Sequence, residues 1–566
     1  MIKKDQTRLS KHLLPVVLLL CAMLLCWVPV YAADTITECE NMTTGGTYAG
    51  KITSPFNGVA LYANNDYCAY SQYFSSSTHS FSVRGCSSNS STARVDLKIG
   101  GAMVGSFYFT GTALTVQTLS NITHGTGNQE VRLTVTTDNG TWDVYVDYLQ
   151  IGGSDSDPTP GSPWNWVGIV GTGQSLSVGA TPVLSTTQPY NNLKLSLGSL
   201  KVPPYDANSS ALKMVPLVEP IRSLATSFPG AYPSNIWGET PHTSMANQIT
   251  SMVKSAGGAD YITAHTVVGE SGQGISVIRK GATDTGNTGR AYAASIFEVT
   301  AINRLAKAAG KTYGVGGITL IHGETDCGNP TYESDIRKLW SDYNQDIKAI
   351  TGQTQKIPMF LVQQHSYPST GTSASTLAQW KAGVDYAGDI ICIGPNYQRY
   401  YGSDHVHLVS SGYQQLGEKF AQVYYERVVL GRDWQPLQPT SATKSGRVIT
   451  VNLHVPVAPL VWDSTLPAPN QNSQTEWKNG KGFEVTANGS RVTISSVEIS
   501  GSSVKITCAN DLPASGVNVG YAFTGGTARA NGSYRWGLLR DSDPFKGSIT
   551  GVSQPNFCVA FQMAVQ

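Results

Sequence analysis

Ser175, Asp404 and His407 are the residues whose types and spacing in this sequence could do nucleophilic chemistry. Ser175 comes after Gly171-Thr172-Gly173-Gln174, which follows the apolar run 166–170. A buried strand that ends in Gly-x-Gly turns tightly and exposes the next polar side chain. A serine becomes a good nucleophile only when a histidine takes its proton and an acid orients that histidine. The segment Asp404-His405-Val406-His407 supplies both partners, so we predict an acyl-transfer site.

Two further polar clusters follow apolar runs that have the character of strands. Gly269-Glu270-Ser271-Gly272 comes after the run 261–268, and His322-Gly323-Glu324-Thr325-Asp326 comes after the run 317–321. Because parallel strands end at one edge of a sheet, these clusters should lie close to Ser175. We also interpret residues 357–363 and 390–393 as strands, and residues 289–310, 332–350 and 410–429 as helices. This alternation predicts a doubly wound α/β domain over residues 164–433.

Taken singly, the acidic residues of these clusters allow other interpretations. Glu324 and Asp326 could cap a helix instead of serving chemistry. A glycosidase needs two opposed carboxylates, and Glu270, Glu324 and Asp326 are available for that role. These alternatives stay open at the level of sequence.

Residues 33–152 have the alternation of an all-β module. Val95, Leu97 and Ile99 alternate with polar residues, and turn residues separate the runs, which predicts a β-sandwich. Glu38 and Glu40 are expected to alternate on one strand, and Asp138, Asp143 and Asp147 gather near the end of the module. Bunched carboxylates on a loop are typical of calcium sites, although solvated turn residues would look the same.

The composition, the first residues and the cysteines indicate what class of protein this is. With 566 residues, 39 Lys+Arg and 38 Asp+Glu, the chain should hold several domains, and nothing in its charge favours nucleic acid or a membrane surface as a partner. Residues 1–32 have the basic start and apolar middle of a signal peptide, so we expect secretion. Seven of the nine cysteines remain after its removal. Their scattered positions allow one or two disulfides and lack metal-type spacing.

The rest of the chain consists of a linker and a second β region. Residues 153–163 are rich in Ser, Asp, Pro and Gly and should form a flexible linker. From residue 434 to 566, apolar and polar residues alternate again between Gly- and Asn-rich turns, which predicts a C-terminal β-sandwich. No cluster of ligands or acids marks a function for it.

The central residues resemble the SGNH (GDSL-type) hydrolase superfamily, in particular carbohydrate esterase family 6 and the sialate O-acetylesterases. The resemblance covers about residues 163–431 and implies a three-layer α/β fold. It implies that Ser175 is the nucleophile, that His407 is its general base and that Asp404 orients His407. The backbone N–H groups of Ser175 and Gly272 would form the oxyanion hole, and no catalytic metal is implied.

The third polar cluster departs from that superfamily. Its usual Gly-x-Asn-Asp is absent, and His322 stands where the two subfamilies have Gln before Gly-Glu. The third oxyanion donor is therefore open, and His322 is the candidate for it.

The N-terminal module resembles the family-36 carbohydrate-binding modules. The resemblance rests on Glu38-Cys39-Glu40-Asn41-Met42, residues 45–51, residues 58–62 and the stretch 140–147. It implies that Asp138, Asp143 and the Trp142 carbonyl hold a calcium ion that binds xylan, with Tyr48 beside the sugar. By similarity to the wider superfamily, Glu38, Glu40 and Asp147 would hold a second, structural calcium, and Cys39 would point away from it.

We therefore predict a secreted carbohydrate O-acetylesterase that acts on acetylated xylan or a related plant polysaccharide. Its architecture should be a β-sandwich binding module, an SGNH-type α/β domain and a C-terminal β-sandwich. The alternatives are an acetylesterase for pectic or sialic substrates and a non-catalytic xylan-binding scaffold. The altered third cluster keeps the scaffold in consideration.

Overall fold

The computed structural model describes residues 35–74, 77–136, 143–152, 161–201, 203–222, 237–282, 290–469 and 474–566. The predicted signal peptide lies outside these ranges. The chain divides into two compact units, Met1–Pro158 and Thr159–Gln566. Among the described residues, no helix has both the length and the apolar character needed to cross a membrane.

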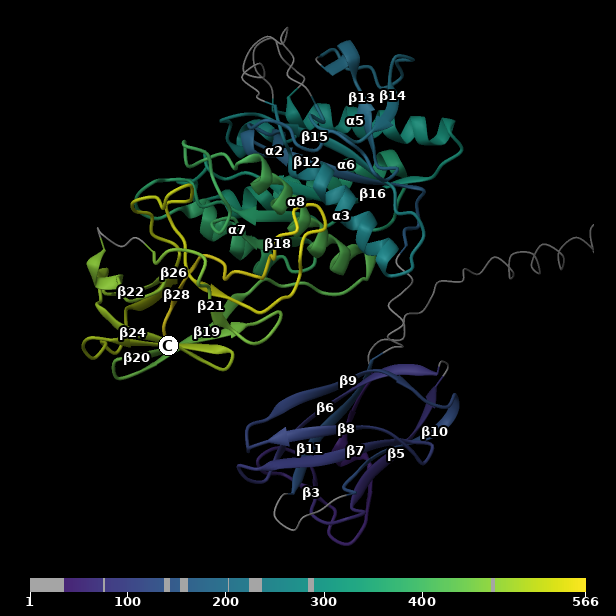
Figure 1. Ribbon diagram of the computed structural model, residues 1–566, viewed down its shortest axis with the longest axis vertical. Helices are drawn as coiled ribbons and strands as arrows, with labels where there is room; N and C mark the ends of the chain where they lie inside the picture. The colour runs from purple at the N-terminus through teal and green to yellow at the C-terminus, as the bar shows by residue number, and fades with distance from the viewer. Residues whose placement is uncertain are drawn as a thin grey trace, which may run out of the picture. The chain divides into compact units, whose positions relative to one another are not determined.

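The first unit consists of two antiparallel sheets around one core (Figure 1). Val95 and Leu97 of one sheet and Val146 and Leu149 of the other are fully buried in that core. The predicted sheet-rich N-terminal module is confirmed. One sheet has the order β3 (Gly50–Ile52), β4 (Gly58–Leu61), β11 (Val144–Gly152), β6 (Thr78–Ser87) and β9 (Thr115–Thr123), with β1 (Thr35–Glu38) also on β11. The other has the order β2 (Thr43–Gly45), β5 (Tyr67–Phe74), β10 (Gly127–Thr134), β7 (Thr92–Ile99) and β8 (Ala102–Thr110).

The start of this unit differs from the sequence prediction at its acidic pair. Glu38 is the last residue of β1, and Glu40 lies in a short 3₁₀ turn, Cys39–Asn41. The expectation that both glutamates alternate on one strand is therefore wrong. The side chain of Cys39 turns into the core, where it is fully buried.

The second unit is built on a seven-stranded sheet, parallel except at β14. Its order is β14 (Lys213–Pro216), β13 (Leu193–Ser196), β15 (Thr263–Gly269), β12 (Trp166–Gly173), β16 (Tyr313–Ile321), β17 (Met359–Gln363) and β18 (Ile390–Pro395). Nearly every residue of the central strands is buried, as expected of a parallel sheet covered on both faces. The five strands predicted from apolar runs are all present, while β13 and β14 were not foreseen.

Helices cover both faces of this sheet because neighbouring strand residues point to opposite sides. Ile169 packs in one core with α3 and α8, and Val170 packs in another with α5 and α6. The helices are α2 (Ser175–Val178), α3 (Pro241–Ser255), α4 (Ile275–Ile278), α5 (Ala291–Ala308), α6 (Tyr332–Thr351), α7 (Ala374–Asp385) and α8 (Ser410–Tyr424). The long helices α5, α6 and α8 match the predicted ranges closely, whereas α3 and α7 were not predicted.

The C-terminal strands belong to the same compact unit as the seven-stranded sheet. They form a sheet of β19 (Gln438–Ser445), β20 (Val448–His454), β25 (Ser503–Cys508) and β24 (Ile494–Ser500), and a second of β23 (Ser490–Arg491), β22 (Phe483–Ala487), β26 (Val517–Tyr521) and β28 (Phe561–Ala564). A two-stranded ribbon joins β21 (Val461–Trp462) to β27 (Leu539–Arg540). Yellow loops between these strands run back to the α/β part in Figure 1, where Asn556 accepts a hydrogen bond from Lys419 of α8.

Candidate active site

Ser175 lies at a sharp junction between β12 and α2. Gly173 has φ +145°, and a Cβ atom there would come within 2.0 Å of the Ile321 carbonyl oxygen. Only glycine fits such a close approach of two backbones at this φ. The chain then turns, and Ser175 becomes the first residue of α2, with 6% of its surface exposed. The side chain predicted to be exposed at the tip of the turn is thus nearly buried.

The serine, the histidine and the aspartate meet in one line of hydrogen bonds. His407 Nε2 lies 2.8 Å from Ser175 Oγ, and His407 Nδ1 lies 2.6 Å from Asp404 Oδ2. Since the carboxylate can only accept, Nδ1 carries the proton and Nε2 accepts from the serine hydroxyl. This is the tautomer that a general base needs.

Backbone contacts fix the orientation of Asp404. Its Oδ1 accepts hydrogen bonds from the N–H groups of Val406 and His407 at 3.0 and 3.1 Å. Partial burial alone would raise the pKa of Asp404, but the hydrogen bonds from His407 and the two N–H groups outweigh it, so its pKa is lowered. The carboxylate therefore stays charged and can stabilise a positive imidazolium on His407.

The two backbone donors expected for an oxyanion come from neighbouring strands. Gly173 and Gly269 face each other in the parallel pairing of β12 and β15. Ser175 follows the first by two residues, and Gly272 follows the second by three. Gly272 lies in an exposed turn with φ +70°. The register thus brings the turn of Gly272 to the edge at which Ser175 lies.

The structure does not support His322 as the third oxyanion donor. Its ring is buried, Nε2 lies 2.9 Å from the Gln273 carbonyl oxygen, and Nδ1 lies 2.8 Å from the Tyr332 hydroxyl. Because the carbonyl can only accept, His322 donates from Nε2 and accepts from Tyr332 at Nδ1. Both ring nitrogens are used, so His322 fastens the Gln273 turn instead of pointing a free N–H at the serine.

Two acidic residues that follow strands accept hydrogen bonds from backbone N–H groups at the starts of helices. Asp326 Oδ2 accepts from the Ile275 N–H at 2.7 Å, at the first residue of α4. Glu270 is buried against Arg290, with 2.7 Å between Oε2 and Nη2, and accepts the Ala291 N–H at the start of α5. The helix-capping interpretation, made for Glu324 and Asp326, therefore fits Asp326, and Glu270 caps a helix as well. These contacts explain both carboxylates without the pair of opposed acids that a glycosidase needs.

Glu324 is the buried acid with the most unusual environment. It is 5% exposed, its Oε2 has no hydrogen-bond partner among the described residues, and burial raises its pKa to about 7. A buried carboxyl with few partners therefore keeps its proton to a higher pH than an exposed glutamate does. Once ionised, Glu324 also raises the pKa of the neighbouring Tyr401 and Tyr413, after the larger effect of their own burial.

We expect the free energy of unfolding to fall as Glu324 loses its proton. The folded pKa of about 7 lies above the ordinary 4.5. The stabilisation is therefore complete below pH 4.5 and is lost as the pH rises through 7, by on the order of 3 kcal/mol. Glu324→Gln should remove this part of the pH dependence in denaturant unfolding measured between about pH 4 and pH 8. The exposed Glu498→Gln is the control, and parallel curves for wild type and Glu324→Gln would contradict the assignment.

In the first unit, the predicted sugar-binding residue Tyr48 is 65% exposed. Its loop is held by Asp66, whose Oδ1 accepts the N–H groups of Thr47 and Tyr48 at 2.7 and 3.1 Å. Asp143 is half-buried, and its N–H donates to Ser88 Oγ. The predicted ligands Asp138 and Trp142 lie outside the described residues. Sequence reasoning missed Asp66, whose isolated position gave no signal.

The second predicted calcium site has its carboxylates in one neighbourhood. Burial raises the pKa of Glu38, and the charges of Asp147 and Glu40 raise it further. Glu40 Oε2 is buried without a hydrogen-bond partner in the described part of the chain, while Asp147 pairs with Arg84 at 2.7 Å. Within the same residues, no three His, Cys, Asp or Glu side chains alone form a metal site. The repelling charges and the unpaired oxygen fit a cation whose coordination backbone oxygens would complete.

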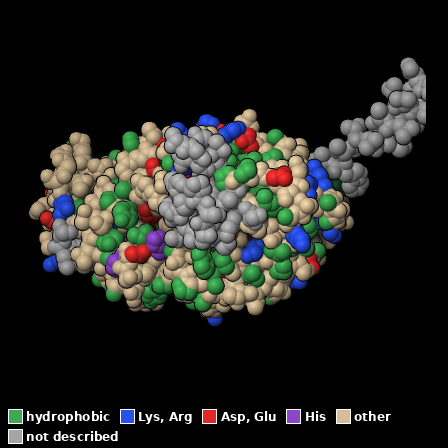
Figure 2. Space-filling model, turned by 90° about the horizontal axis from the view of Figure 1, so that it is seen from above, with side chains coloured by type: hydrophobic (Ala, Val, Ile, Leu, Met, Phe, Trp, Pro, Cys, Tyr) green, Lys and Arg blue, Asp and Glu red, His purple; other side chains and the backbone are tan. Residues whose placement is uncertain are grey.

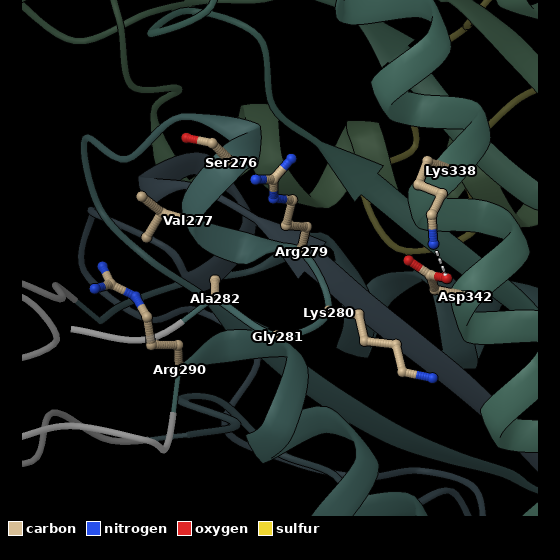
Figure 3. Close-up of a pocket in the computed structure, with 9 residues that line it drawn as sticks. All are labelled: Ser276, Val277, Arg279, Lys280, Gly281, Ala282, Arg290, Lys338 and Asp342. Atoms are coloured by element: carbon tan, nitrogen blue, oxygen red, sulfur yellow. Dashed lines mark hydrogen bonds and ion pairs between the residues drawn. The ribbon is translucent and has the colours of Figure 1, made fainter.

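A polar pocket lies beside α4 (Figure 3). Its lining residues come from α4, the loop after it, the start of α5 and one side of α6, where Lys338 faces Asp342; they are Ser276, Val277, Arg279, Lys280, Gly281, Ala282, Arg290, Lys338 and Asp342. None of the serine, histidine and aspartate of the candidate site lines it. On the face shown in Figure 2, Lys and Arg side chains are scattered in small groups among apolar and neutral polar surface.

Two further features of the described residues are their free cysteines and a contact made by the loop that carries Asp404 and His407. All seven cysteines within the described ranges, Cys39, Cys68, Cys86, Cys327, Cys392, Cys508 and Cys558, are free thiols. Residues 397–407, the segment that carries Asp404 and His407, contact residues 529–532 of the C-terminal region. Sequence reasoning missed this contact because nothing in a single sequence pairs segments so far apart.

Comparisons with known proteins place the first unit in a family. Residues 33–153 match the model of the carbohydrate binding module (family 6). A solved carbohydrate-binding module CBM36, in complex with calcium and xylotriose, is 66% identical and covers 21% of this chain and 99% of its own, with a TM-score of 0.21. A bifunctional xylanase/deacetylase of Pseudobutyrivibrio xylanivorans is 57% identical over 122 residues. The chain spans 20% of the length of each of the two curated relatives it matches.

Another solved structure matches most of the chain at low sequence identity. The solved structure of a carbohydrate acetylesterase from Xanthomonas citri is 12% identical, covers 88% of this chain and 96% of its own, and has a TM-score of 0.42.

Proposed function

We propose that this chain, whose N-terminal unit belongs to the CBM36 carbohydrate-binding modules, is a secreted O-acetylesterase that acts on acetylated xylan. The observation that carries the proposal is the continuous hydrogen-bonded line from Asp404 through His407 to Ser175. The same serine–histidine–acid arrangement occurs in serine hydrolases with unrelated folds. We interpret residues 164–433 as an SGNH-type three-layer domain and residues 434–566 as a β-sandwich that supports it.

The first half of the reaction transfers the acetyl group to the enzyme. His407 Nε2 removes the proton of Ser175, whose Oγ attacks the acetyl carbonyl carbon and forms a tetrahedral oxyanion. The N–H groups of Ser175 and Gly272 would stabilise this oxyanion, an effect worth about 3 kcal/mol for each donor. The C–O bond to the sugar then breaks, and His407 returns the proton to the sugar alkoxide, which leaves acetyl-Ser175.

The second half repeats the chemistry with water. His407 takes a proton from the water as the water oxygen attacks the acetyl carbon. The second tetrahedral intermediate then breaks its bond to Ser175 Oγ, which takes the proton back from His407, and the acetic acid that is released ionises to acetate. Asp404 keeps its charge throughout and stabilises the imidazolium each time it forms. The proposal requires no metal in this cycle.

The N-terminal module would bind the polymer and keep the enzyme close to it. Asp143, with Asp138 and the Trp142 carbonyl, would hold a calcium ion that ligates sugar hydroxyls, and the exposed Tyr48 would lie beside the sugar. Glu38, Glu40 and Asp147 would hold a structural calcium. Binding to the polymer raises the effective concentration of the esterase at its substrate.

Acetate release tests both parts of the proposal. The full chain should release acetate from insoluble acetylated xylan, and a calcium chelator should slow this release about ten-fold or more by removing the module from the polymer. Hydrolysis of a small soluble acetyl ester should be unchanged by the chelator, because the serine site needs no calcium.

The possible outcomes separate the alternatives. Faster release from acetylated pectin or sialic acids than from xylan would move the substrate to those sugars. Release of xylo-oligosaccharides without acetate would point to glycosidase chemistry. Xylan binding with no hydrolysis of any acetyl ester would leave a non-catalytic scaffold.

A further inference from the structure

Residues 529–532 of the C-terminal region hold the loop that carries Asp404 and His407. The Tyr401 N–H donates to the Asn531 carbonyl at 3.0 Å, and His405 Nδ1 lies 2.8 Å from the Gly532 carbonyl oxygen. These bonds are made on either side of Asp404. The contact therefore bears directly on where the aspartate and histidine lie.

Arg529 adds a third attachment to the same loop. It is 5% exposed, and its Nη2 donates to the carbonyl oxygens of Tyr397 at 2.8 Å and of Arg399 at 2.5 Å. A guanidinium buried this deeply must be hydrogen bonded, and here its partners are backbone atoms of the catalytic loop. The bonds thus fix the path of the main chain, whatever the side chains of Tyr397 and Arg399 do.

Gly532 makes this arrangement possible. A Cβ atom at position 532 would come within 2.2 Å of both Cγ and Nε of Arg529. The arginine side chain therefore packs directly against the Cα atom of Gly532, where any larger residue would displace it. Three residues after Gly532, Arg535 is 1% exposed and donates a hydrogen bond to the Tyr367 carbonyl at 3.0 Å.

His405 is the residue that would move if this support were lost. It has φ +57°, a left-handed conformation that is unfavourable for a residue with a Cβ, and it stands between Asp404 and Val406. Its bond to Gly532 helps to keep it there. Relaxation of His405 would re-aim the peptide that carries Asp404.

We propose that residues 529–532, with Arg529 as the positioning residue, complete the active site by holding the 397–407 loop in its catalytic geometry. This inference rests on the proposed esterase function, and it gives the C-terminal region a role in the rate of the chemical step. A displacement of about 1 Å far from the reacting atoms can lower a rate by up to about 100-fold. Arg529 acts on the reaction only through this loop.

The test compares Arg529→Ala with a matched arginine of the same region. Arg540 pairs with Asp463 at 2.9 Å and with the Asp541 carbonyl, all within the C-terminal region. Arg529→Ala should lower kcat for a small acetyl ester about 10- to 100-fold with KM nearly unchanged, and the acid limb of the kcat/KM profile should shift. Arg529→Lys should recover part of kcat. Arg540→Ala should keep the wild-type kcat and pH profile.

A second pair of variants covers the case in which Arg529→Ala does not fold. His405→Asn should retain most of kcat, because Asn tolerates the left-handed conformation and can donate to the Gly532 carbonyl, while His405→Ala should lose it. A folded Arg529→Ala with wild-type kcat and pH profile would overturn the inference, as would equal losses in Arg529→Ala and Arg540→Ala. Ser175→Ala, assayed alongside, separates this failure from that of the esterase proposal, since only the latter predicts Ser175-dependent hydrolysis in the wild type.

Discussion

Ser175→Ala should lower kcat for acetyl ester hydrolysis by about 10³- to 10⁶-fold, as the loss of a serine nucleophile does in hydrolases of this kind. The reason is geometric: Ser175 Oγ is the atom that His407 Nε2 contacts at 2.8 Å. Alanine leaves the histidine with no hydroxyl to deprotonate, while the backbone donors stay in place. Initial rates on a small ester, with acetate quantified, are the measurement.

Ser177→Ala is the matched control for this substitution. Ser177 lies two residues further along α2, is 1% exposed, and donates to the Gln174 carbonyl at 2.7 Å instead of contacting His407. Its loss should cost some stability and leave most of the rate. If the Ser175 variant hydrolyses the ester as fast as the Ser177 variant, the nucleophile has been assigned wrongly.

Asp404→Asn should have the second-largest effect, a loss in kcat of about 10⁴-fold near neutral pH, as for the equivalent change in other triads. An amide can donate to His407 Nδ1, which favours the tautomer with its proton on Nε2. That proton would face Ser175 Oγ, so the histidine could no longer act as a base. The side chain of Asp404 is 50% exposed, so the substitution should leave the fold intact.

The pH dependence of kcat distinguishes this explanation from simple unfolding. The deficit of Asp404→Asn should shrink at high pH, where hydroxide can take over part of the role of the base. Asp389→Asn removes a carboxylate that pairs with Lys356 just before β18, at the opposite edge of the sheet, and should keep the wild-type rate. A wild-type rate in Asp404→Asn would show that His407 does not need the Asp404 carboxylate, and the assigned role of Asp404 would be wrong.

The sequence was sufficient for features that depend on local pattern. Apolar runs identified β12 and β16, and the stripe of Leu416, Phe420 and Val423 identified α8, because burial on one face imposes these periods. The rule that parallel strands end at one edge of a sheet predicted that Ser175 and the turn of Gly272 lie at the same edge.

Features that depend on competition between contacts could not be predicted in this way. Glu38 and Glu40 alternate in sequence, yet the strand ends at Glu38 and a 3₁₀ turn with the buried Cys39 follows it. His322 looks like a free donor until Tyr332 and Gln273 are seen to occupy its ring. Arg529 has no signal at all, since its partners are backbone carbonyls about 130 residues away.

The attachment of the 397–407 loop to Gly532 also sets the order in which activity can appear during synthesis. The His405–Gly532 bond spans 127 residues, so a nascent chain has made its serine, aspartate and histidine long before the segment that steadies them leaves the ribosome. A chain that ends at residue 433 would carry the whole triad and still lack its support. The N-terminal module is a separate compact unit, whereas the C-terminal region shares one compact unit with the proposed catalytic domain.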